Sequence, residues 1–289
     1  MTRISAANQS HYLLGGPDEV EPVKEKSTSI LDMVAPVHPL TGGRRFFLFP
    51  ERLEIALGGY NYNNYVDKQG GPWDNDEFDR VVQDCLKEMI PHTGRDNLPW
   101  KITMIDTSSV NAWAKMGGFM GINRGIIDRM AKDTRDFGLG KISMEDKVRA
   151  VIAHEMAHVS LRHSARFAEI LLIWTLLSVW VVPIWEIIED YLPFTIESYL
   201  FTRYSRSQEF EADQYGMHLM WRCGHDPKAM IWSEHFLKDY EPTYGIGLLD
   251  FWDRMFWTHP TTDQRIEAEK KVLAELEARG PFVPEIDND

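Results

Sequence analysis

The sequence has few of the features that mark disulfide-stabilised or repeat proteins. It contains two cysteines, Cys85 and Cys223, among 289 residues. Two distant cysteines cannot form a disulfide framework, and neither belongs to a C-x-x-C metal pattern. We expect two buried free thiols, with a single redox-sensitive bridge as the alternative. The chain also has no internal repeat.

Long blocks of positive charge are missing as well. The net charge is −13 and the isoelectric point is about 5.2. This balance argues against nucleic acid as the main partner and against binding of anionic lipid by a polybasic segment. Residues 1–16 contain no apolar run of the kind that a secretory signal carries. We therefore expect no signal peptide, and either a cytoplasmic location or a peripheral or monotopic attachment to a membrane.

No apolar run reaches the length of a membrane-spanning helix. ILLIWTLLSVWVVPIW, residues 170–185, has sixteen residues without a charge, and a bilayer needs about 20. The next apolar stretch, 191–201, is shorter and contains Glu197. We interpret 167–201 as an apolar helical insert that packs on the domain or dips into a membrane interface. The tryptophans within 170–185 favour the interface, and burial within an oligomer is the alternative.

The remaining sequence predicts one helical domain with a small sheet. Residues 1–40 are polar and rich in Gly, Pro and Ser, which indicates a flexible N-terminal arm. Residues 41–289 are predicted to form the domain. Helical periodicity appears at 50–66, 75–90, 144–165, 205–223, 227–240 and 262–279. Short strands separated by a glycine turn are predicted between 100 and 123. The order predicts an α+β fold, mostly helical, with a small antiparallel sheet.

The 144–165 helix contains an H-E-x-x-H motif. His154 and His158 are one helical turn apart, so both imidazoles can reach one metal ion. Glu155 lies about 100° further round, where a carboxylate can take a proton from a metal-bound water. A chance match on a solvated face is the alternative. The apolar flanks argue against it, because burying these polar groups without partners costs free energy.

A zinc site of this kind needs a third protein ligand. His163 is close in sequence but lies five residues past His158 on a helix that is predicted to continue. The metzincin spacing would need a glycine at position 161 and a histidine at position 164, where this chain has Leu161 and Ser164. We therefore interpret His163 as a surface residue or as a residue that touches a ligand.

The better third ligand lies in SRSQEFEADQYG, residues 205–216. Glu209 can complete the site and leave the fourth position for water. Asp213, one turn further on, can accept a hydrogen bond from a ligand histidine. Glu211 is predicted to face away and is the weaker choice. An acidic surface patch is the alternative interpretation of this segment.

Four stretches together resemble one enzyme family. VIAHEMAHVSLRHS (151–164) followed by YSRSQEFEADQYG (204–216) resembles the gluzincin zinc metallopeptidases of the HtpX and CAAX prenyl protease 1 family, peptidase family forty-eight. VNAWAKMGG (110–118) resembles its substrate-side strand, and THPTTDQRI (258–266) its late motif. The resemblance covers about 41–275 and is greatest to the branch of the mitochondrial inner-membrane stress metalloendopeptidase and its bacterial relatives.

The resemblance implies a zincin-type metalloprotease domain with one Zn²⁺ per chain. The implied zinc ligands are His154, His158 and Glu209, with Glu155 as the base and Asp213 as an orienting residue. An extended protein or peptide substrate would pair with the edge strand. The implied substrate-binding residues are Asn111, Ala112, Trp113 and Arg265. His259 is a catalytic candidate that would help a developing oxyanion, and a packing role for it stays open.

We therefore predict a zinc-dependent endopeptidase that hydrolyses proteins, among them membrane-associated or misfolded proteins in protein quality control. The alternatives are a catalytically silent, zinc-stabilised scaffold and a membrane-bound interaction module. The intact Glu155 argues against the scaffold, because a structural zinc site needs no base. The sequence leaves oligomerisation open.

Overall fold

The computed structural model describes residues 35–60 except 39, 41 and 48, and residues 62–166, 168–169, 173, 206–240 and 262–282. Its α-helices are α2 (Glu51–Gly59), α3 (Tyr62–Lys68), α4 (Asp76–Met89), α5 (Arg124–Lys132), α6 (Met144–Ser160), α10 (Arg206–Arg222), α11 (Lys228–Leu237) and α13 (Thr262–Arg279). The strands are β1 (Lys101–Ile105), β2 (Ala112–Ala114) and β3 (Phe119–Asn123). Short 3-10 turns are η1 (Ile90–His92), η2 (Met116–Gly118) and η3 (Lys238–Tyr240).

The described strands form one mixed sheet in the order β1-β3-β2. β3 runs parallel to β1, with Lys101 opposite Phe119, and antiparallel to β2, with Trp113 opposite Gly121. The α+β class is confirmed, but the prediction of an antiparallel sheet is wrong for the β1–β3 pair. The chain passes from β1 to the far edge and then turns back into the centre, so β3 regains the direction of β1.

The turn between β2 and β3 depends on glycine. Gly117 and Gly118 have φ angles of 73° and 93°, a left-handed conformation that other residues rarely adopt. A side chain at Gly117 would also place its Cβ 2.6 Å from the Cα of Ile55. The glycines therefore allow both the reversal of the chain and the close packing of α2 on this turn.

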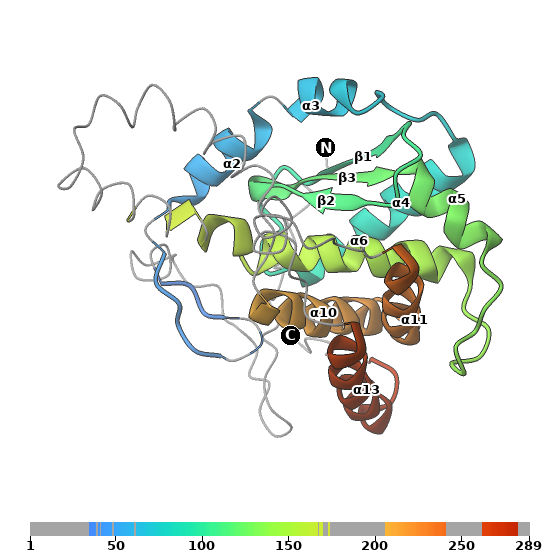
Figure 1. Cartoon of the computed structure of the whole chain (residues 1–289). Helices are drawn as coiled ribbons and strands as arrows, with labels where there is room; N and C mark the ends of the chain where they lie inside the picture. The colour runs from blue at the N-terminus through green and yellow to red at the C-terminus, as the bar shows by residue number, and fades with distance from the viewer. Residues whose placement is uncertain are drawn as a thin grey trace, which may run out of the picture.

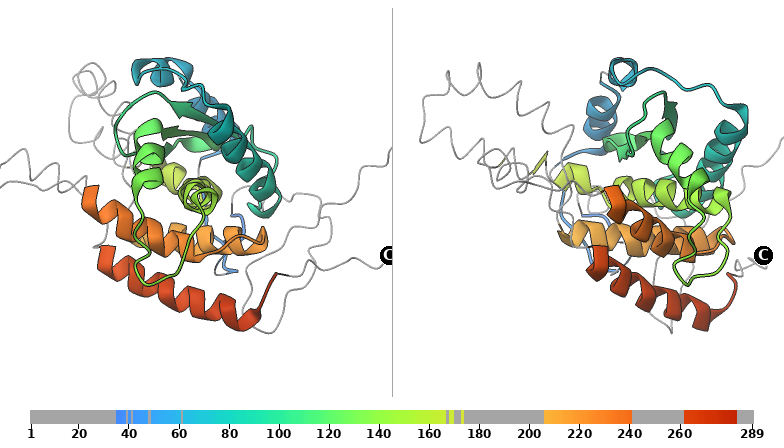
Figure 2. Two further views of the ribbon diagram at one scale, coloured as in Figure 1. Left: turned by 90° about the vertical axis from the view of Figure 1, so that its right-hand side faces the viewer. Right: turned by 45° about the vertical axis from the view of Figure 1, so that its right-hand side comes forward.

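Helix α6 lies at the centre of the molecule. Figure 1 shows the sheet on one side of α6 and α10 on the other, with α13 beyond α10 and with α2 and α3 across the sheet. The turned views in Figure 2 show the same layers. α6 packs against α4, α10, α11 and β2. The main hydrophobic core surrounds it, and its fully buried side chains include Ile152, Met156, Met120, Met217 and Trp232.

Capping residues explain where two of the helices begin. The Ser143 hydroxyl oxygen accepts a hydrogen bond from the backbone N–H of Asp146 at 3.0 Å, at the start of α6. The Asn75 side chain accepts one from the N–H of Phe78 at the start of α4. Each bond satisfies an N–H that the first turn of a helix leaves without a backbone partner. The capping pattern expected at Ser143 is therefore present.

The predicted continuation of this helix to about residue 165 is wrong. α6 ends at Ser160, and Arg162 has a left-handed φ of 58°. The Arg162 guanidinium, which is buried, donates to a Glu54 carboxylate oxygen at 2.6 Å and to the Phe49 carbonyl at 2.5 Å. These long-range contacts stabilise a backbone conformation that a non-glycine residue adopts at a cost of about 1–2 kcal/mol.

Two predicted segments fall largely outside the described residues. Of the 1–40 arm only the last residues are described, and there Ala35 and His38 are buried and Val37 forms a β-bridge with Arg44. Of the 167–201 insert only residues 168, 169 and 173 are described. Among the described helices none is long and apolar enough to cross a membrane. The proposed domain boundaries and membrane contact stay predictions.

Candidate metal centre

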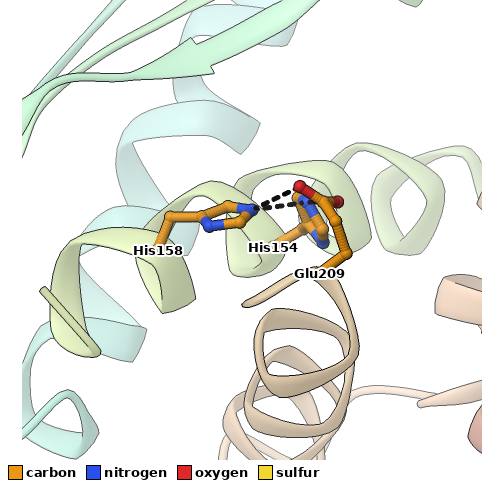
Figure 3. A group of neighbouring side chains, drawn as sticks. All are labelled: His154, His158 and Glu209. Atoms are coloured by element: carbon orange, nitrogen blue, oxygen red, sulfur yellow. Dashed lines mark hydrogen bonds and ion pairs between the residues drawn. The ribbon is translucent and has the colours of Figure 1, made fainter. Parts of the chain in front are cut away.

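Helices α6 and α10 bring three of the predicted residues together. Figure 3 shows His154 and His158 on α6 turned toward Glu209 on α10. The Nε2 atoms of the two imidazoles are 3.0 Å apart. The Glu209 carboxylate oxygens lie 3.5 Å from the Nε2 of His154 and 3.7 Å from the Nε2 of His158. Two nitrogens and a carboxylate therefore converge on one point.

These spacings fit a tetrahedral zinc ion. Ligand bonds of about 2.0–2.2 Å place neighbouring donor atoms roughly 3.3–3.6 Å apart, and the three observed separations lie close to this range. The side chains of His158 and Glu209 are 1% and 0% exposed, whereas that of His154 is 18% exposed. The centre is thus enclosed on two sides and accessible beside His154.

A buried network lies behind His154. Its Nδ1 is 3.0 Å from an Asp213 carboxylate oxygen. Arg265 donates to both oxygens of Asp213, at 2.7 and 2.5 Å, and contacts a Glu234 oxygen at 2.8 Å. An N–H at Nδ1 directed to Asp213 leaves the lone pair of Nε2 facing Glu209, which is the arrangement that a metal ligand needs.

The electrostatics favour this arrangement at Asp213 and at His158 but oppose it at His154. Burial would raise the pKa of Asp213, but Arg265 and His154 hold it below its usual value, so Asp213 accepts hydrogen bonds as a carboxylate. Burial lowers the pKa of His158 well below 6.5, which favours the neutral imidazole that binds metals. For His154, burial is outweighed by Asp213 and Glu209, which raise its pKa. A proton therefore competes with a metal ion for His154.

Arg265 occupies a different environment from the one that the sequence predicts. It is 6% exposed and faces the carboxylates behind His154, whereas the predicted role was contact with substrate. Glu234 on α11 and Glu269 on α13, which the sequence analysis missed, complete this cluster with Asp213. The detectable signal was the i,i+4 spacing of Arg265 and Glu269 on one helix.

The buried carboxyl group of Glu269 lowers the stability of the folded protein at neutral pH. It is 1% exposed, and neither of its carboxylate oxygens has a hydrogen-bond partner within the part of the chain that the structure describes. Burial raises its pKa well above 4.5, reinforced by Asp213 and Glu234. A raised pKa in the folded state means that stability is greatest at low pH and is lost as the pH rises through that value.

We therefore expect Glu269→Met to stabilise the zinc-free protein. The gain should be about 1–3 kcal/mol near neutral pH, because an apolar side chain of similar length avoids the burial cost. The gain should grow as the pH rises above the ordinary glutamate pKa of about 4.3, because the unfolded carboxyl then loses its proton while the buried one keeps it. Urea unfolding at several pH values measures this. A variant that is less stable at every pH would contradict the assignment.

The other predicted residues take up varied positions. Glu155 is half-buried on α6 beside His154. Ala112 and Trp113 lie on β2, an edge strand among the described strands, and Asn111 directly precedes them. The Trp113 ring packs edge-on against aromatic rings of α3, so it is the β2 backbone that could meet an extended peptide. His259 lies outside the described residues.

His163 is buried, at 1% exposure, so its interpretation as a surface residue is wrong. Its Nδ1 is 2.8 Å from the Nδ1 of His158, which leaves the interpretation as a residue that touches a predicted ligand. Glu211 is not in the group that converges with Glu209, and it contacts His163 and Arg45. Sequence reasoning missed Arg45, because nothing local connects it to a partner 166 residues away.

The sequence profile of peptidase family M48 matches residues 75–272, well over half of the chain. The matched region contains the sheet, α6 and α10, and with them all three converging side chains. The chain belongs to peptidase family M48. The resemblance that the motifs indicated is therefore confirmed.

Comparison with curated proteins finds metalloendopeptidases as relatives. The mitochondrial metalloendopeptidase OMA1 of Saccharomyces cerevisiae is 25% identical over 253 residues, covering 81% of this chain and 68% of the yeast protein. OMA1 of Schizosaccharomyces pombe is 26% identical over 68% of this chain and 54% of its own length. Bos taurus OMA1 is 22% identical over 80% of this chain and 44% of its own length. The chain thus spans between 44% and 68% of the length of these relatives.

Family membership and these relatives support a metal-dependent endopeptidase. The family implies a metal cofactor, and the group of His154, His158 and Glu209 supplies donor atoms for one. Peptidase relatives also imply protein substrates.

Proposed function

We propose that this M48 peptidase is a zinc endopeptidase with one zinc ion held by His154, His158 and Glu209. The observation that carries the proposal is the convergence of two Nε2 atoms and a buried carboxylate at separations of 3.0–3.7 Å. Two histidines with one glutamate are a usual ligand set for catalytic zinc, with an open position for water.

Glu155 is the proposed general base. Zinc bound at this centre would polarise the scissile carbonyl and lower the pKa of a bound water. Glu155 lies one residue after His154 on the same helix, beside the donor atoms and not among them. Its carboxylate would take the proton of the attacking water and pass it to the leaving amine. Asp213 and Arg265 would hold the His154 ring in place meanwhile.

The proposed substrate is an extended protein segment that adds a strand to β2. Residues 111–113 lie at the edge of the described sheet, and β2 packs directly against α6. A strand paired with β2 would therefore run along the helix that carries the H-E-x-x-H motif. His259 would stabilise the oxyanion from the late motif; its position is not among the described residues.

We further propose that the substrates include misfolded or membrane-associated proteins and that residues 170–185 contact a membrane interface. Support comes from the sixteen uncharged residues and their tryptophans. The names of the relatives place those proteins in mitochondria. Flotation of the full chain with phosphatidylcholine vesicles tests the contact, and a chain that stays at the bottom of the gradient contradicts it.

Metal removal tests the enzymatic proposal. The purified chain is expected to contain one zinc per chain and to cleave casein, because two histidines and one glutamate are a usual ligand set for catalytic zinc. A strong chelator should stop cleavage, and added zinc should restore most of it. Zinc binding without any cleavage would favour the silent scaffold. Cleavage that continues in the metal-free protein would overturn the proposal.

A further inference from the structure

The second ring nitrogen of His158 belongs to a chain of contacts that leads away from the metal centre. Its Nδ1 is 2.8 Å from the Nδ1 of His163. The Nε2 of His163 is 3.3 Å from a Glu211 carboxylate oxygen. The same carboxylate accepts two hydrogen bonds from the Arg45 guanidinium, at 2.9 and 2.6 Å. His158 and His163 are each 1% exposed, so water does not compete for these contacts.

Hydrogen-bond chemistry allows one arrangement of protons that leaves His158 able to bind a metal. Two ring nitrogens at 2.8 Å need one proton between them. If it sits on the Nδ1 of His158, the lone pair of Nε2 faces Glu209. His163 then accepts at Nδ1 and carries its own proton on Nε2, where it donates to Glu211. The reversed arrangement would put a proton on the Nε2 of His158 and block a metal ion.

We propose that His163 and Glu211 are positioning residues that fix the tautomer and ring orientation of His158. They would orient the His158 ring as Asp213 and Arg265 orient the His154 ring. Each ligand histidine would then have its own set of supporting hydrogen bonds. The inference rests on the proposed zinc site and adds residues that the H-E-x-x-H and E-x-x-x-D motifs do not contain.

The backbone between the two histidines is shaped for this contact. On an uninterrupted helix His163 would lie about 140° round from His158 and face elsewhere. The left-handed Arg162 ends α6 and returns the next side chain to the ligand. Glu54 and the Phe49 carbonyl hold the Arg162 guanidinium in place. A strained residue beside a functional group is a common sign of such a role.

Two residues from the N-terminal part of the protein, His38 and Arg45, complete this series of contacts. Arg45 binds Glu211 from outside, and the Nε2 of His38 lies 3.6 Å from the same carboxylate. An alternative is that Glu211 only anchors this segment to α10. Anchoring alone does not explain the third member, His163, whose Nδ1 is directed at a ligand nitrogen and not at the segment.

The test compares zinc affinity in matched variants of the full chain, measured by competition with a chromophoric chelator. His163→Phe keeps a planar ring and removes both nitrogens. His163→Asn keeps an acceptor close to the position of Nδ1. His218→Phe is the control, because His218 is also buried on α10 but packs against Trp221, away from the metal centre. The melting temperature of each zinc-free variant is recorded as well.

His163→Phe is expected to weaken zinc binding ten- to hundredfold, which is typical when a residue supporting a ligand is lost. His163→Asn should recover part of that loss, and Glu211→Gln should show a smaller loss. His218→Phe should bind zinc as the wild type does. A purely structural role predicts the opposite pattern, with a lower melting temperature and unchanged zinc affinity in His163→Phe, and that result overturns the inference.

Two further outcomes separate this inference from the proposed function. If Glu209→Gln binds zinc as tightly as the wild type, the ligand set itself is wrong. If Glu209→Gln loses zinc while His163→Phe and Glu211→Gln keep wild-type affinity, only the positioning role is wrong. Should His163→Phe fail to fold, the partly exposed Glu211 carries the test, because Glu211→Gln changes one atom and preserves volume.

Discussion

A Glu155→Gln variant is expected to keep its zinc and to lose peptidase activity by a factor of about 10² to 10⁴, the usual contribution of a general base. Glutamine has the same size and can hydrogen-bond to water, but it cannot take a proton. Glu155 lies beside the three converging donor atoms and is not one of them. The substitution should therefore leave the ligand geometry unchanged while the proton acceptor is lost.

The measurement is the rate of casein or peptide cleavage, made together with the zinc content of the same preparation. Glu145→Gln is a matched control. It makes the same change of side chain at an exposed residue in the first turn of α6, away from the metal centre. It should cleave at the wild-type rate. If Glu155→Gln also cleaves at that rate with zinc bound, the proposed base is wrong. If it loses zinc, Glu155 acts as a ligand.

Glu209→Gln should lower zinc affinity by more than about a hundredfold, beyond the loss that follows removal of a residue supporting a ligand. The substitution removes the only anionic donor of the group, and its neutral amide stays in a fully buried position between the two imidazoles. Cleavage at low zinc should fall with it.

Chelator competition measures the Glu209→Gln effect directly, with Glu145→Gln again as the control for adding one amide to the chain. A dissociation constant within a few-fold of the wild type would mean that another group completes the site. The effect should exceed that of His163→Phe in the same assay. A larger loss of zinc affinity in His163→Phe than in Glu209→Gln would contradict the assignment of Glu209 as a ligand and of His163 as a residue that positions His158.

The parts of the site that follow from local rules were predictable. His154 and His158 share a helix face because they are four residues apart, and no tertiary information is needed for that. The α13 bounds, Thr262–Arg279, match the predicted 262–279, because a long periodic segment determines its own helix. Glu209 was found from an acidic pair at helical spacing together with the upstream motif.

The parts that depend on distant contacts were not predictable. The end of α6 is determined by Arg162, whose partners Glu54 and Phe49 lie more than a hundred residues away. Helical periodicity therefore predicted an α6 that continues past Ser160, and on that longer helix His163 would face away from His158. Arg45 was missed for the same reason.

The order of the strands in the sheet and the burial of two glutamates could not be predicted from local sequence either. A glycine turn predicts that β2 and β3 pair antiparallel, but it does not reveal that β3 also pairs with β1 in parallel. Glu234 and Glu269 look like solvated positions on amphipathic helices. Only the packing of α10, α11 and α13 shows that these carboxyls surround Arg265.

The central claim is that one zinc ion lies between α6 and α10. Anomalous diffraction from a crystal of the zinc-loaded chain, recorded on both sides of the zinc absorption edge, tests it most directly. We predict one strong peak about 2.0–2.2 Å from the Nε2 of His154, the Nε2 of His158 and a carboxylate oxygen of Glu209. A loaded crystal with no peak there, or with zinc held by other side chains, would contradict the account.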